Sequence, residues 1–188
     1  MLGMHGTYYA NMAISNCDLL IVLGSRFSDR VTGKIETFAA NAKIIHIDVD
    51  PSSINKNVIV DLPIVSDLKT ALQQINGMLA EQQYRFNETE RQAWLDQIEA
   101  WKQEVPLTYC QNGEIIKPQF VIEKLFDLTR GKAIITTEVG QNQMWAAQFY
   151  RYENPHTFIS SGGLGTMGYG FPAAIGVQCA FPDALVVD

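Results

Sequence analysis

At 188 residues, 47% of them hydrophobic and 18% charged, the chain has the composition of an ordinary globular protein of one large or two small domains. The formal charge of −6 is spread along the sequence without a basic, aromatic-rich cluster, which excludes the usual nucleic-acid surface. Isolated cysteines and histidines argue against disulfides and a zinc site, and no apolar run could cross a bilayer. Without a secretory signal at its start, we expect a cytoplasmic protein.

The first part of the chain, residues 1 to about 80, is predicted to form α/β layers. Residues 18–23 and 43–48 are short apolar runs, typical of strands inside a parallel sheet. Residues 31–42 could supply the crossover helix between them. A second helix over residues 68–79, capped by Ser66, follows from the spacing of its leucines and isoleucine.

Residues 81–117 are predicted to be a helical linker. Trp94, Leu95, Ile98 and Trp101 have helical spacing, and Asn87 with Glu90 resembles a capping box. The tryptophans could form a partner-binding face, but ordinary burial preference favours a helix between domains that packs its own aromatic residues.

Residues 118–188 return to alternating helices and strands. The pattern predicts a helix through Phe126, strands at 132–137, 157–160 and 184–188, and helices at 143–150 and 172–180. This rhythm implies parallel strands with right-handed crossovers. We therefore expect an α/β chain of two partial doubly wound parallel-sheet domains, and its two ends suggest a fragment cut on both sides.

The glycine-rich segment 160–170 admits two interpretations. Gly163, Gly165 and Gly168 satisfy the GxGxxG pattern, with Asp188 suitably placed for a ribose, as in NAD-dependent dehydrogenases. However, Pro172 suggests that the helix begins several residues after the motif, whereas a dinucleotide needs the helix to open within it. The segment 138–145 adds a second glycine-bearing loop after the preceding strand, and two such loops make a better ligand crevice.

The motifs themselves resemble a known family. The stretches TTEVGQNQMWAAQFY and SSGGLGTMGYGFPAAIG resemble the diphosphate-binding domain of thiamine-diphosphate enzymes. LGMHGTYYAN and GSRFSDRVTG resemble the central domain of acetohydroxyacid synthases. The resemblance implies a central FAD-binding domain over residues 1–80, a linker over 81–117 and a thiamine-diphosphate domain over 118–188. It assigns the pyrimidine-activating glutamate and the magnesium ligands to segments outside this sequence.

The resemblance also implies site residues in the first part. Residues expected to contact FAD are Gly24, Ser25, Arg26, Asp29, Asp48 and Asp61. Asp48 and Asp61 could instead simply cap strand ends. Arg30 is expected to bind the carboxylate of the second ketoacid, although a lone arginine in a loop is commonly a solvated surface group. Met4 and His5 would lie beside the same substrate channel.

In the last part, the resemblance implies contacts with thiamine diphosphate from Val139, Gly140, Gln141, Asn142, Gly165 and Met167. Many relatives have histidine where this chain has Asn142, and asparagine can donate a hydrogen bond but cannot titrate near neutral pH. Met167 is expected to keep the cofactor bent, unless it packs into the sheet–helix core instead.

The implied reaction condenses pyruvate with pyruvate or 2-ketobutyrate, with loss of carbon dioxide, in branched-chain amino acid biosynthesis. The implied cofactors are thiamine diphosphate, Mg²⁺ and FAD. The implied partners are further catalytic subunits, in a homodimer or tetramer, and a small regulatory subunit. Alternatives are pyruvate oxidase, glyoxylate carboligase, the NAD-dependent dehydrogenase and an inactive remnant.

Overall fold

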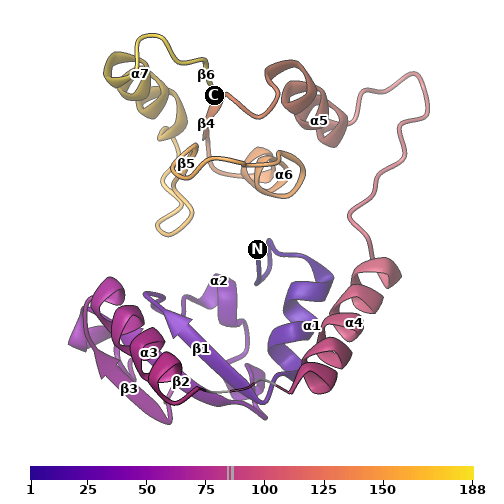
Figure 1. The fold of residues 1–188 in the computed structure, drawn as a ribbon. Helices are drawn as coiled ribbons and strands as arrows, with labels where there is room; N and C mark the ends of the chain where they lie inside the picture. The colour runs from indigo at the N-terminus through magenta and orange to yellow at the C-terminus, as the bar shows by residue number, and fades with distance from the viewer. Residues whose placement is uncertain (84, 86) are drawn as a thin grey trace. The chain divides into compact units, whose positions relative to one another are not determined.

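A computed structural model describes residues 1–83, 85 and 87–188. Its internal contacts divide the chain into two compact units, Leu2–Pro106 and Leu107–Asp188, the latter grouped with Met1 (Figure 1). Each unit is an α/β structure with its own parallel sheet, which confirms the predicted fold class. No helix of the described residues is both long and apolar enough to span a membrane.

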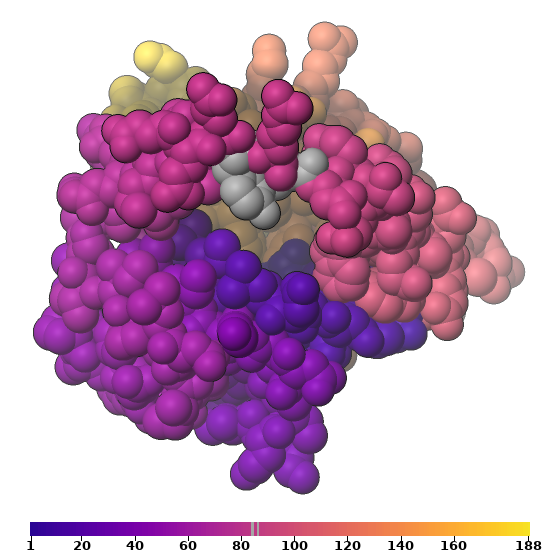
Figure 2. Space-filling model, turned by 60° about the horizontal axis from the view of Figure 1, so that its bottom comes forward, coloured from indigo at the N-terminus to yellow at the C-terminus, as the bar shows by residue number. Residues whose placement is uncertain are grey.

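The first unit is built on a three-stranded parallel sheet of order β1-β2-β3. Its strands are β1 (Leu19–Leu23), β2 (Lys43–Asp48) and β3 (Leu62–Val65). Its helices are α1 (Tyr8–Asn16), α2 (Asp29–Thr32), α3 (Leu68–Glu81) and α4 (Glu88–Glu104), with 3₁₀ turns at Ile35–Thr37 and Pro51–Ser53. In the space-filling view, purple and magenta side chains, the colours of β3 and α3, make up the left part of the near face (Figure 2).

Three local predictions in this unit need correction. Residues 31–42 form no continuous crossover helix, because α2 ends at Gly33, whose φ of 58° is a left-handed conformation that breaks the helix. The strand β3 was not predicted, since Pro63 within it disfavours a strand assignment. The cap of α3 is Asp67 rather than Ser66: the Asp67 carboxylate accepts the Thr70 N–H at 3.0 Å.

The core of the first unit lies between the sheet and the segments that follow β1 and β2. Val22, Phe27, Ile44, Val58 and Val60 are all buried there, with Ala39. The wholly buried His46 of β2 packs edge-on against Phe27, with ring centroids 5.0 Å apart. Burial of these apolar groups fixes where β1 and β2 end, and therefore where the following loops begin.

Helix α4, within the predicted linker, packs on α1 in the first unit. The Asn87 side chain accepts the Glu90 N–H at 3.3 Å, as the capping pattern suggested. Trp94 and Trp101 pack against each other edge to face, with centroids 5.8 Å apart. Positions 84 and 86 of the predicted linker lie outside the described residues. The division of residues 1–80, 81–117 and 118–188 into functional domains stays a prediction.

The second unit carries another three-stranded parallel sheet, of order β5-β4-β6. Its strands are β4 (Ile134–Thr137), β5 (Phe158–Ser160) and β6 (Val186–Val187). Its helices are α5 (Pro118–Thr129), α6 (Gln141–Phe149) and α7 (Gly170–Ala180). The central strand β4 is the most buried, so both loops that flank the sheet's carboxyl edge lie beside a well-anchored strand.

Candidate functional site

The loops after β1 and β2 enclose a polar pocket of about 570 Å³ in the first unit. Arg26 and Asp29, two of the predicted FAD contacts, line it together with Asp50, Lys56 and Asn57. The Asn57 amide braces the loop by donating to the backbone oxygens of Arg26 and Phe27, at 3.0 and 3.1 Å. Pockets outside the carboxyl ends of parallel strands are the common ligand sites of open α/β sheets.

The remaining predicted FAD contacts lie in different places. Gly24, with φ 62°, and Ser25 leave the end of β1 beside this pocket. Asp48, 8% exposed, ends β2, and its carboxylate accepts the Asp50 N–H at 2.9 Å. Asp61 lies at the opposite edge, where its carboxylate accepts the Ile44 N–H at 2.8 Å. The structure therefore brings Asp61 to the start of β2, the position expected of a residue that caps a strand end.

The predicted substrate residues Arg30 and Met4 are neighbours. The Arg30 guanidinium lies 3.6 Å from the Met4 sulfur, and the Met4 N–H donates to the Arg30 backbone oxygen at 2.9 Å. Gly3 makes this approach possible, because a β-carbon there would lie 2.3 Å from that same Arg30 oxygen. His5 follows directly in the chain. Sequence reasoning did not identify Gly3, although its place before Met4 and His5 was the available signal.

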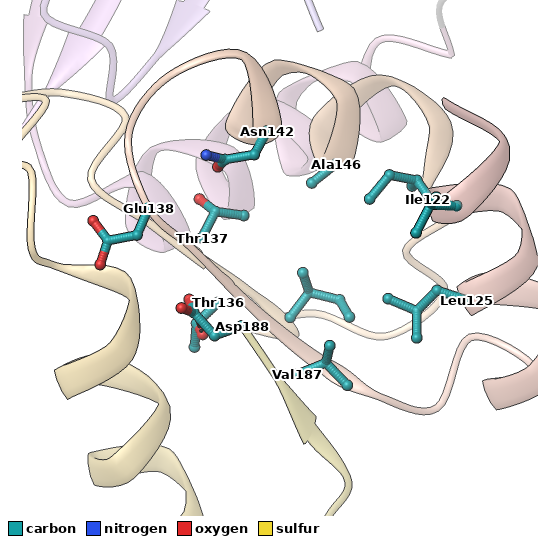
Figure 3. Close-up of a pocket in the computed structure, with 11 residues that line it drawn as sticks. Ile122, Leu125, Thr136, Thr137, Glu138, Asn142, Ala146, Val187 and Asp188 are labelled. Carbon is teal, nitrogen blue, oxygen red and sulfur yellow. Dashed lines mark hydrogen bonds between the residues drawn. The ribbon is translucent and has the colours of Figure 1, made fainter. Parts of the chain in front are cut away.

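A second pocket, of about 440 Å³, lies at the carboxyl edge of the second sheet. Its polar end is formed by Thr136, Thr137, Glu138, Asn142 and Asp188, and its apolar end includes Ile122, Leu125 and Val187 (Figure 3). The polar end combines residues of β4, the start of α6 and the end of β6. Asn142 is thus in the pocket, as a contact with thiamine diphosphate would require.

The turn Val139–Asn142 leads into α6, whose N-terminus has no side-chain cap among the described residues. Gly140 is the N-terminal cap of α6, with φ 139°, a conformation that favours glycine. Gly140 has no side chain, so it makes no capping hydrogen bond to this helix. The amides of the first turn of a helix need acceptors and favour negative charge. The donors at this turn therefore fit a diphosphate group.

The glycine loop approaches that turn from β5. Gly165 has φ 64°, and a β-carbon there would lie 3.8 Å from a Val139 methyl group, so the two predicted cofactor contacts adjoin each other. The Ser161 side chain accepts the Thr166 N–H at 3.0 Å and helps to fold the loop back. Met167 is 80% exposed, which rules out packing in the core of this unit. Its side chain is available to a ligand.

Glu138 closes the start of α7. Its carboxylate accepts the N–H groups of Gly168 at 2.7 Å, Gly170 at 2.9 Å and Phe171 at 3.3 Å. These amides, that of Gly168 foremost, hold the pKa of Glu138 below its ordinary value. Because the dinucleotide interpretation of GxGxxG needs this helix start for a pyrophosphate, the carboxylate argues directly against it. Sequence reasoning missed this role, since the thirty residues that separate the partners left no signal.

Further hydrogen bonds join the strands at this edge. The Thr136 hydroxyl donates to the Asp188 carboxylate at 2.8 Å, so Asp188 is engaged within the unit rather than offered to a ribose. The buried Gln143 amide donates to the Ser160 hydroxyl, which also bonds the Thr137 hydroxyl at 2.7 Å. Within the described residues, no group of three or more histidine, cysteine or acidic side chains could hold a metal ion.

Comparison with known proteins agrees with this geometry. Residues 1–75 match the family "Thiamine pyrophosphate enzyme, central domain", and residues 138–188 match "Thiamine pyrophosphate enzyme, C-terminal TPP binding domain". The chain belongs to the thiamine pyrophosphate enzymes. The second match includes both glycine-bearing loops, the open start of α6 and Met167.

Among the thiamine pyrophosphate enzymes, the chain is similar to acetolactate synthases. It is 52% identical over 188 residues to the chloroplastic acetolactate synthase of Arabidopsis thaliana, covering all of this chain and 28% of that protein. It is 50% identical over 187 residues to the acetolactate synthase large subunit of Cyanidium caldarium, covering 32% of that protein. The chain thus spans about a third of the length of these relatives. The resemblance drawn from the motifs is confirmed, and the dehydrogenase alternative is not favoured.

One expectation is wrong by this comparison. A cytoplasmic protein was expected because the sequence begins without a secretory signal, but the similar proteins of Arabidopsis thaliana, Brassica napus and Oryza sativa are named as chloroplastic. The test for a secretory signal does not address delivery to an organelle. The location therefore does not follow from the residues on which the expectation was based.

Proposed function

We propose that this chain is part of an acetolactate synthase catalytic subunit, which condenses pyruvate with a second 2-ketoacid with loss of carbon dioxide. The observation that carries the proposal is the similarity to acetolactate synthases over all 188 residues, at 52% identity. The open start of α6 and the exposed Met167 of the adjoining glycine loop support it independently, because they offer amides to a diphosphate and an apolar surface to a ring.

In this proposal, the turn Val139–Asn142 holds the diphosphate of thiamine diphosphate, while Gly165 and Met167 support its aminopyrimidine. Thiamine diphosphate supplies the electron sink for decarboxylation and carbon–carbon bond formation. Asn142 can donate a hydrogen bond to a phosphate oxygen from within the pocket. Met167, on a loop fixed at both ends, would keep the ring in the bent shape.

The first unit would bind FAD and the acceptor substrate. Gly24, Ser25, Arg26, Asp29 and Asp48 lie on or beside the carboxyl ends of β1 and β2, and such a polar, glycine-bearing edge fits a cofactor with phosphate and hydroxyl groups. Asp61, at the other edge of the sheet, is left out of this proposed set because of its position.

Arg30 would recognise the carboxylate of the second ketoacid. Its guanidinium is exposed on α2, and its planar fork can bind a carboxylate through two hydrogen bonds. Met4 lies against it and would line the same approach. Mg²⁺, a partner catalytic subunit and a small regulatory subunit belong to the same proposal, by resemblance to the family.

A chimera tests the function. The 188 residues would replace the matching segment of the Arabidopsis synthase, with the unaltered synthase as control. We expect acetolactate from pyruvate, dependent on added thiamine diphosphate, and no product from the 188-residue chain alone. A chimera that folds and binds thiamine diphosphate in calorimetry, yet forms no acetolactate, would overturn the proposed reaction. Failure to bind thiamine diphosphate, in a chimera with native-like circular dichroism, would overturn the proposed cofactor site.

A further inference from the structure

Two helices of the second unit begin at the carboxyl edge of the sheet, yet their starts differ. α6 begins after Gly140, which has no side chain to cap it. α7 begins at Gly170, and its first amides donate to the Glu138 carboxylate from the end of β4. Because a helix start attracts anions, both positions could receive a phosphate group. Only the start of α7 already holds an anion supplied by the protein.

We propose that Glu138 is a positioning residue: its carboxylate holds the glycine loop and the start of α7 against β4, and so leaves the start of α6 as the phosphate site. The bidentate geometry supports this role. One carboxylate oxygen accepts the Gly168 N–H at 2.7 Å, within the loop, while the other accepts the Gly170 N–H at 2.9 Å, at the helix. A single side chain therefore fixes the loop and the helix together.

The packing around Gly170 makes the same junction rigid. A β-carbon at Gly170 would lie 2.6 Å from both the Thr137 carbonyl carbon and the Glu138 nitrogen. The start of α7 thus packs directly against the end of β4, and the Glu138 carboxylate lies close to the first amides of the helix. With this end of the loop fixed, Gly165 stays beside Val139, and Met167 remains exposed towards solvent.

The groups around Glu138 indicate which protonation state of its carboxylate holds the loop. The recorded partners of its carboxylate are backbone amides, which favour the ionised form and lower its pKa. Among the described residues, a second carboxylate near this edge is that of Asp188, which lies close to Gly170 and accepts the Thr136 hydroxyl. Tyr169 is the further titratable residue in the loop. Ionised Glu138 is therefore the acceptor that binds the loop.

Amide hydrogen exchange, followed by NMR on the 188-residue chain, tests the proposal. We expect Glu138→Gln to speed exchange at Gly168, Gly170 and Phe171 by roughly ten- to a hundredfold, the usual effect of losing hydrogen bonds to a charged group. Exchange at Phe181, whose N–H donates to Val177 at the far end of α7, should stay unchanged. Glu153→Gln, which neutralises an exposed carboxylate of the same unit, is the matched control and should leave all four amides alone.

A pH profile distinguishes a role of the Glu138 charge from a role of the volume of its side chain. Since the folded-state pKa of Glu138 is lowered, protection of the three amides should persist below the ordinary glutamate pKa of 4.5 and be lost as the pH falls through the lowered value. Glu138→Gln should lack this step. Unchanged exchange in Glu138→Gln, or a step that persists in it, would overturn the proposal.

This inference rests on the proposed function only for the identity of the phosphate compound. The exchange measurements contain no ligand, so they can succeed while the chimera forms no acetolactate, and they can fail while the chimera is active. Successful exchange measurements with an inactive chimera would overturn the proposed reaction and support the role of Glu138. Failed exchange measurements with an active chimera would overturn the role of Glu138 and support the reaction.

Discussion

One loop at the carboxyl edge of each sheet is held by a side chain, and the two side chains differ in chemistry. In the first unit, a neutral amide, Asn57, holds the loop after β1 through two backbone oxygens. In the second unit, a charged carboxylate, Glu138, holds the glycine loop through backbone amides. A neutral brace keeps its strength across the pH range, whereas a carboxylate loses its strength when it is protonated. The hold on the loop after β1 is thus independent of pH, whereas the hold on the glycine loop depends on an ionised carboxylate.

The two edges nevertheless share one device, a glycine that allows backbone to approach backbone. Gly3 allows the segment before α1 to touch α2, and Gly170 allows α7 to touch β4. In both, an added β-carbon would lie closer than 3.0 Å to main-chain atoms. Steric constraint is therefore common to the two sites, whereas the side chains that hold the loop after β1 and the glycine loop differ.

The largest expected effect comes from Gly170→Ala. Its β-carbon would meet backbone atoms of Thr137 and Glu138 at 2.6 Å, and backbone cannot swing aside as a flexible side chain can. We expect the free energy of unfolding of the second unit to fall by about 3 kcal/mol, at the upper end of overpacking effects. Urea unfolding followed by circular dichroism measures the change.

Gly176→Ala, in the same helix, is the matched control. A β-carbon there would meet nothing within 4 Å, so alanine should raise stability by about 0.5–1 kcal/mol through its better helix propensity. Gly3→Ala and Gly77→Ala form the equivalent pair in the first unit. Equal effects of Gly170→Ala and Gly176→Ala would show that the junction at β4 is not tight.

The next largest effect is expected for Arg30→Ala in the chimera. Loss of a charge-assisted contact with the acceptor carboxylate is worth about 1.5–3 kcal/mol, or roughly ten- to a hundredfold in carboligation rate. Release of carbon dioxide from the first pyruvate should suffer less, because that step does not need the acceptor. Acetolactate and carbon dioxide would be measured in the same reaction.

Arg91→Ala provides the control for Arg30. Arg91 is also an exposed helical arginine, but it pairs with Glu88 on α4, and such surface pairs contribute little. It should leave both products unchanged. If Arg30→Ala behaved like Arg91→Ala, Arg30 would be a solvated surface cation.

The smallest effect is expected for Met167→Ala. We expect up to about tenfold lower turnover in the chimera, because a thioether packed on a ring contributes roughly 0.3–1.5 kcal/mol. The free energy of unfolding should change by less than about 0.5 kcal/mol, since Met167 is 80% exposed. Turnover per folded molecule and urea unfolding are the two measurements.

Met167→Leu, which nearly conserves volume, should retain most of the activity. Met78→Ala, at another exposed methionine but in the first unit, should affect neither quantity. A loss of stability in Met167→Ala that accounts for its whole loss of activity would contradict the role of a support for the ring.

The sequence predicted the strands best where apolar runs were continuous. Residues 43–48 form β2 as predicted, and residues 18–23 differ from β1 by one residue. β3 was missed because Pro63 masks a strand that pairs through its other backbone groups. The crossover after β1 was misjudged because Gly33 ends α2 with a left-handed backbone, which the periodicity of apolar residues does not report.

The candidate site was predictable in its local parts and not in its long-range contacts. Motif resemblance pointed to Asn142, which lines the pocket of the second unit, to Gly165, which adjoins Val139, and to Met167, which is exposed. It did not reveal that Glu138 bonds amides thirty residues later, because such a bond depends on the packing of α7 against β4. The resemblance to the family placed Asp61 with the FAD contacts, whereas its hydrogen bond to Ile44 and the strand register put it at the start of β2.

The distribution of tryptophan gives each unit its own optical reporter. Trp94 and Trp101 stack edge to face on α4 of the first unit, with ring centroids 5.8 Å apart, while Trp145 lies alone on α6 of the second. Two indoles this close couple their electronic transitions, and a solitary indole does not. The coupled circular dichroism signal thus follows the first unit, and the emission of Trp145, once the other two are replaced by phenylalanine, follows the ligand edge of the second.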